Sequence, residues 1–111
     1  MTAAMKQSLR VYIVNFEGCT TKMGFLMRLA RAFKLDAARI VKGEVWKAFC
    51  ERLSSLTASD IPVCVRLVGL DDAYTSVPKE CEALLRLLRA ACSNCGAFRA
   101  EAMIGNMKWK V

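Results

Sequence analysis

Hydrophobic residues gather in two short runs that are rich in β-branched side chains. The runs are Leu9–Phe16 and Ile61–Leu70. Continuous apolar runs of this length are typical of strands. Pro62 stands at the beginning of the second run, where it removes no important ladder bond. We therefore predict two strands, and we expect the first to be buried on both faces.

Residues 21–35 repeat their apolar side chains at helical spacing and predict an amphipathic helix. Thr20 or Thr21 can cap its first turn. We expect Arg28, Arg31 and Lys34 on the exposed face. The predicted buried stripe consists of Met23, Leu26, Met27, Ala30 and Phe33.

A second helix is predicted over Pro78–Ser93. Pro78 fits the first helical turn, where its missing N–H costs nothing. Asn94 and Gly96 supply a stop signal. The expected core face consists of Cys81, Leu84, Leu85, Leu88 and Cys92.

Four segments are less clear. Ala38–Lys42 fits a short strand. Residues 44–56 fit both a helix and an alternating strand, and their length favours the helix. Asp71-Asp72 is typical of a turn, after which Ala73–Val77 could return as a short antiparallel strand. The basic, apolar segment 97–111 is expected to be an added strand or a docking tail.

The order of these elements predicts an α/β fold in one domain, residues 1–111. One arrangement that fits is a thioredoxin-like β-α-β-β-α core with a hairpin before the last helix. The alternative is a ferredoxin-like βαββαβ fold in which residues 98–111 form the fourth strand. No apolar stretch approaches the roughly 18–20 residues that cross a bilayer, so we expect no membrane contact.

Positive charge is concentrated at the two ends of the chain. The net charge is +7, divided as +6 over residues 1–48, −3 over residues 49–82 and +4 over residues 83–111. Basic segments are explained equally well by binding to a polyanion such as RNA and by a simple contribution to solubility. The residues expected to contact RNA phosphates are Lys22, Arg28, Arg31, Lys34, Arg39, Lys42, Lys108 and Lys110.

The composition argues against catalysis and against a metal or cofactor. The chain has no histidine, which removes the commonest general base and metal ligand. Its glycines lack the spacing of a phosphate-binding loop. Cys92 and Cys95 form a CxxC, but at the end of a helix, where the dipole disfavours a thiolate. We therefore predict a non-enzyme with free cysteines, no metal, no cofactor and no small-molecule substrate.

The run Val11–Phe16 also fits the first motif of RNA-recognition domains, with Tyr12 as the stacking aromatic. A second aromatic strand should accompany it, but Ile61–Leu70 contains no aromatic residue. This disfavours a domain that reads RNA sequence, which we retain only as an alternative.

The layout resembles a known family. It consists of the strand LRVYIVNF, an amphipathic helix, a variable middle, the segment DIPVCVRLVGLDDAYTSV and the helix KECEALLRLLRAA. This is similar to the thioredoxin-like mitochondrial ribosomal proteins numbered fifty-three in the large-subunit series.

The resemblance implies a structural subunit of the mitochondrial ribosome in the mitochondrial matrix. Its partners would be ribosomal RNA and neighbouring ribosomal proteins. The alternative that remains open is a small interaction or assembly subunit of another organellar complex.

Overall fold

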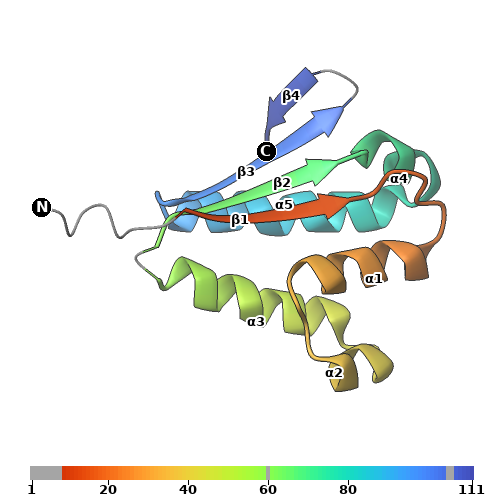
Figure 1. Cartoon of the computed structure of the whole chain (residues 1–111), viewed down its shortest axis with the longest axis horizontal. Coiled ribbons are helices and arrows are strands. Elements are labelled where there is room, and N and C mark those ends of the chain that lie inside the picture. The colour runs from red at the N-terminus through yellow and green to blue at the C-terminus, as the bar shows by residue number, and fades with distance from the viewer. Residues whose placement is uncertain (1–8, 60, 105–106) are drawn as a thin grey trace, which may run out of the picture.

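A computed structural model of the chain describes residues 9–59, 61–104 and 107–111, and it shows helices packed mainly against one face of a four-stranded sheet (Figure 1). The elements are β1 (Arg10–Asn15), α1 (Lys22–Ala32), α2 (Ala37–Val41), α3 (Val45–Thr57), β2 (Val63–Val68), α4 (Leu70–Ser76), α5 (Pro78–Asn94), β3 (Phe98–Ile104) and β4 (Met107–Lys110). The predicted α/β class is confirmed.

The strands lie in the order β1-β2-β3-β4. The first three are parallel, with Tyr12 beside Val65 and Val65 beside Ala100. The last pair is antiparallel, with Met103 beside Lys108. The segment after residue 96 thus contains two strands.

Neither predicted arrangement describes this sheet. The thioredoxin-like core depended on an antiparallel hairpin before the last helix, and residues 70–76 are helical instead. The ferredoxin-like alternative gave residues 98–111 a single strand. The structure therefore does not confirm the thioredoxin-like topology.

Residues at the helix starts explain why two predicted short strands are helices. The Asp36 side chain accepts a hydrogen bond from the backbone N–H of Ala38 at 3.0 Å, which begins α2 in place of the strand Ala38–Lys42. Asp71 and Asp72 stand in the first turn of α4, where the helix dipole favours negative charge. They begin a helix rather than form a turn, so the strand Ala73–Val77 was wrong.

The other predicted helices are present in the structure. Segment 44–56 forms the helix α3, as its length favoured, with Glu44 as the residue before the first turn. In α5 the side chains of Cys81, Leu84 and Leu88 are fully buried, whereas Leu85 and Cys92 of the predicted core face are only partly buried. Thr21 caps α1, because its Oγ1 accepts from Gly24 N at 2.9 Å.

The open face of the sheet corrects the prediction that β1 is buried on both sides. Val14 is buried, but Val11 and Ile13 are 47% and 55% exposed. The helices cover the face that carries Tyr12 and Val14, and they leave the opposite face open. A continuous apolar run therefore forms an edge strand that is exposed on one face.

The buried face of α1 is rotated from the predicted stripe. Phe25, Leu29 and Phe33 are fully buried, whereas Met23 is 66% exposed and Met27 38% exposed. Ring stacking sets this rotation, because Phe16 lies 4.5 Å from Phe25 between ring centroids. Of the predicted stripe, Ala30 and Phe33 are buried.

An aromatic cluster joins the sheet to α1 and α3. The ring centroids of Tyr12 and Phe33 are 4.8 Å apart, and those of Phe33 and Phe49 are 5.0 Å apart. Such pairs contribute about 0.5–1.5 kcal/mol each beyond the burial of their surface.

Among the described residues, no helix is both long and apolar enough to cross a bilayer.

Candidate functional site

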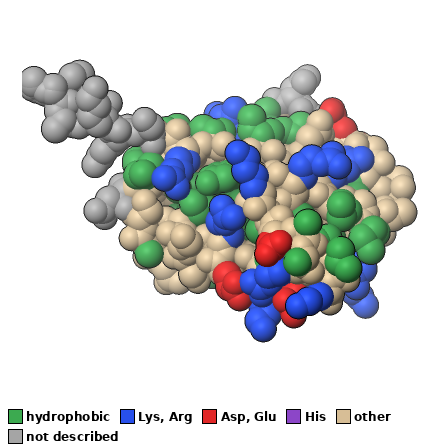
Figure 2. Space-filling model, turned by 60° about the horizontal axis from the view of Figure 1, so that its bottom comes forward, with side chains coloured by type: hydrophobic (Ala, Val, Ile, Leu, Met, Phe, Trp, Pro, Cys, Tyr) green, Lys and Arg blue, Asp and Glu red, His purple; other side chains and the backbone are tan. Residues whose placement is uncertain are grey.

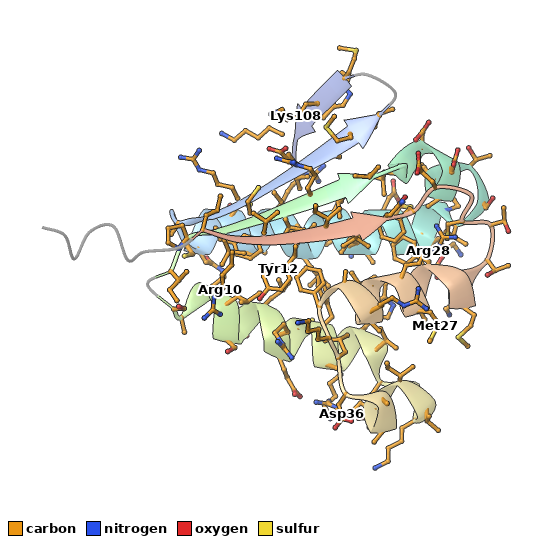
Figure 3. All side chains as sticks on the ribbon, in the orientation of Figure 1. Arg10, Tyr12, Met27, Arg28, Asp36 and Lys108 are labelled. Carbon is orange, nitrogen blue, oxygen red and sulfur yellow. The ribbon has the colours of Figure 1, made fainter. Side chains whose placement is uncertain are left out.

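The predicted RNA-contacting residues fall into two groups in the structure. Lys22, Arg28, Arg31, Lys34, Arg39 and Lys42 belong to α1, α2 and the segments beside them. Lys108 and Lys110 belong to β4, on another side of the molecule. Figure 3 shows Lys108 well apart from Arg28 and Asp36. The two groups therefore do not form one continuous surface.

The side chain of Arg28 binds backbone carbonyl groups and does not simply extend into solvent. Its guanidinium donates hydrogen bonds to the carbonyl oxygens of Asn15 at 3.2 Å and Glu17 at 2.6 Å. The residue is half-buried. It therefore ties α1 to the loop that follows β1, and the expectation of a fully exposed side chain was wrong.

Arg39 is held by carboxylates on α3 and at its start. Its Nε lies 3.1 Å from Glu44 Oε1, and its terminal nitrogens bind both oxygens of Glu51. The Arg39 hydrogen bond lowers the pKa of the Glu51 carboxyl. This network pins α2 to α3 and neutralises two of the acids on the side of the molecule that α1, α2 and α3 form, which we call the helical side.

The remaining cations of the helical side are exposed. Among the ion pairs of the described residues, none involves Lys22, Arg31, Lys34 or Lys42. Figure 2 views the molecule with this side turned forward, and Lys and Arg side chains are spread widely over it while acids are few. The helical side is thus a largely basic surface.

Carboxylates gather instead at the carboxyl end of the parallel strands. Glu17 follows β1, and Asp71 and Asp72 follow β2. The three side chains are exposed and line a hollow of about 230 Å³. We call these three residues the acidic edge. None of them takes part in the ion pairs found within the described ranges.

Backbone geometry fixes the acidic edge. The Asp72 carboxylate accepts from Gly18 N at 2.7 Å, which joins the β1 loop to α4. Gly69 adopts φ +69°, and a Cβ there would lie 2.6 Å from Glu17 N. The two loops therefore pack in direct backbone contact, and only glycine allows that approach.

Sequence reasoning missed the acidic edge because it took Asp71-Asp72 as a plain turn. The signal was available, since Glu17 and Asp71-Asp72 each follow a predicted strand. In open α/β sheets, side chains that follow parallel strands meet at one edge, and ligands bind there. The sequence alone does not show that these two strands are parallel neighbours.

Two of the cysteine thiols have a raised pKa. Burial raises the pKa of Cys81 to about 11. Burial also raises the pKa of Cys92, the first thiol of the CxxC. The thiolate is the reactive form, so both shifts lower reactivity at neutral pH. In the part of the chain that the structure describes, no three His, Cys, Asp or Glu side chains come together as a metal-binding group.

Comparison with known proteins corrects the resemblance to mitochondrial ribosomal proteins. The family model that matches is that of Barstar (barnase inhibitor), and the match covers residues 9–104. No curated protein and no solved structure gave a significant match.

The ribosomal assignment was therefore wrong, and so were ribosomal RNA and ribosomal proteins as partners. The alternatives, an organellar assembly subunit and an RNA-recognition module, do not fit the match either. The mitochondrial matrix stays an untested prediction, and the resemblance that suggested it no longer applies. The match spans the chain from β1 to β3 and all five helices, and so this protein belongs to the barstar (barnase inhibitor) family.

Proposed function

We propose that the chain is a non-catalytic inhibitor that binds a ribonuclease of the barnase type. The observation that carries this proposal is the family match over residues 9–104. The composition agrees with a binding role, because a chain without histidine lacks the commonest general base.

The charge of the target limits where it can bind. A ribonuclease binds a polyanion, so cationic side chains line its substrate cleft. A protein that covers such a cleft needs carboxylates opposite those cations. With a net charge of +7, this chain repels a basic partner over most of its surface. Only a local acidic surface can dock against the cleft.

The acidic edge is the surface that fits this requirement best. Glu17 and Asp71 carry charges that no neighbouring cation neutralises among the described ion pairs. On the helical side, Arg39 binds both Glu44 and Glu51, and Asp36 caps α2. Those carboxylates are already engaged.

The acidic edge is also held in place before any partner arrives. Asp72 and Arg28 fix the backbone of the β1 loop, and Gly69 packs against Glu17. A surface that is already ordered loses little conformational entropy when it binds. Asp71 has no side-chain hydrogen bond among the described contacts, so its carboxylate remains available to a cationic partner.

The proposal is tested by mixing the purified chain with a barnase-type ribonuclease. Cleavage of a fluorogenic RNA substrate should fall in proportion to added chain and stop near one equivalent. Calorimetry should show a saturable complex of the two proteins. Undiminished cleavage at a large excess of chain, with no heat of binding, would contradict the proposed function.

The acidic edge is tested by charge-neutral variants. In the Glu17→Gln, Asp71→Asn double variant, the dissociation constant for the ribonuclease should rise about tenfold or more, because each charge-assisted contact contributes roughly 1–3 kcal/mol. The matched control removes two charges from the helical side, Glu44→Gln with Glu51→Gln. Equal weakening by both pairs would show that only net charge matters and would remove the acidic edge as the interface.

A further inference from the structure

A groove of about 830 Å³ lies between the end of α5 and the strands β3 and β4. It is separate from the acidic edge, and none of the residues that line one hollow lines the other. Its volume falls within the roughly 300–1,000 Å³ of small-molecule sites. Neither the proposed inhibitor function nor its surface involves this groove.

Four cationic side chains from three elements line the groove. They are Arg89 of α5, Arg99 of β3, and Lys108 and Lys110 of β4. Cations that are only solvated generally spread apart, because like charges repel. Here the packing of α5 against the β3–β4 hairpin brings them around one hollow.

The acid in the groove neutralises little of this charge. Glu101 binds Arg66 at 2.9 Å and Lys108 at 3.8 Å. Within the described ranges, Arg89, Arg99 and Lys110 make no ion pair. Three of the cationic residues that line the groove therefore have no carboxylate partner among the described ion pairs.

Two buried apolar residues of β3 border the groove. Phe98 is 2% exposed and Ala100 is 4% exposed. Val111 N donates to Ala100 O at 3.1 Å, which holds the end of β4 against β3.

We propose that this groove binds a small oligoanion, a molecule that carries two or more adjacent phosphate or carboxylate groups. Several cations converge on one site, and this arrangement suits several adjacent negative charges better than a single one. Arg99 supplies a planar guanidinium that binds phosphate or carboxylate in bidentate fashion, and Lys110 supplies a point charge. Cys92 also lines the groove.

The experiment is a calorimetric titration of the chain with pyrophosphate and, separately, with citrate. At least one of them should bind with a stoichiometry near one, and acetate should bind far more weakly. Tighter binding of pyrophosphate would identify a phosphate ligand, and tighter binding of citrate would identify a carboxylate ligand. No saturable binding of either oligoanion overturns the proposal.

Variants locate the site. The Arg99→Gln, Lys110→Gln pair should raise the dissociation constant about tenfold or more, because two charge-assisted contacts are lost. The control, Arg31→Gln with Lys47→Gln, removes the same charges from exposed positions on α1 and α3 and should leave binding nearly unchanged. Arg89→Gln tests the contribution of α5, which forms one side of the groove, without changing β3 or β4. Equal weakening by the control overturns the proposal, because it would show a general effect of net charge.

Discussion

Gly69 is the residue at which backbone geometry and the candidate interface meet. Its φ is +69°, and an added Cβ would lie 2.6 Å from Glu17 N and 2.9 Å from Glu17 Cα. Both contacts are with backbone, which cannot swing aside. Gly43 has a similar φ of +76° but no atom within 4 Å of an added Cβ.

The two glycines form a matched pair for measurement. Gly43→Ala should lower the free energy of unfolding by about 1–2 kcal/mol, the cost of the left-handed conformation alone. Gly69→Ala should cost about 1–3 kcal/mol more, because the loop that carries Glu17 must move. Urea unfolding of both variants checks this. Equal losses would show that the contact with Glu17 is not strained.

Arg28 shows why single residues are hard to assign from a pattern. Helical spacing placed it on the solvent side of α1, but the residue is half-buried. Its long side chain nevertheless reaches back to two carbonyl oxygens of the β1 loop. Amphipathic side chains span several ångströms between backbone and charge, so the direction of the helix face does not fix the contacts of the guanidinium.

At the scale of elements, α1 shows how the buried stripe predicted from the sequence differs from the buried stripe in the structure. Leu29 is fully buried and was not predicted, whereas Met27 was predicted to be buried and is 38% exposed. The helix was recognised correctly. Its rotation was not, because hydrophobic residues occur on more than half of its circumference.

Alanine substitution measures that rotation. Leu29→Ala should lower the free energy of unfolding by about 2–5 kcal/mol, since it leaves a cavity in a packed core. Met27→Ala should cost less than about 1 kcal/mol, as expected for a surface position. Denaturant unfolding distinguishes the two. If Met27→Ala lowered the free energy of unfolding more than Leu29→Ala, the buried stripe predicted from the sequence would be correct.

At the scale of the whole molecule, stability should be uneven across the fold. β2 and β3 lie inside the sheet, and Val65 and Leu67 are fully buried. All four residues of β4 are exposed, and α2 contains no buried residue. Segments with few buried contacts open locally at low free energy.

Amide hydrogen exchange tests this expectation within one sample. Amides of β4 and α2 should exchange at least about tenfold faster than those of β2 and α5, because they open without unfolding the core. Mass spectrometry of peptic peptides reports each segment. Uniform protection would indicate that α2 and β4 unfold only together with the whole chain.

Much of the architecture followed from the sequence itself. The strands around Val11–Val14 and Val63–Val68, the helices α1, α3 and α5, and the α/β class all follow from local hydrophobic spacing and capping. These features depend on neighbours within a few residues along the chain. The acidic segment 49–82 was likewise visible as a reversal of charge.

Tertiary structure alone decided the rest. Parallel pairing of β1 with β2 brought Gly18 to Asp72 across 54 positions of sequence, and stacking of Phe16 on Phe25 set the rotation of α1. The packing of α5 against β3, together with the pairing of β4 with β3, gathered four cations from three elements around one hollow. Each arrangement depends on which strands are neighbours and on how large side chains pack, and local patterns do not encode such long-range contacts.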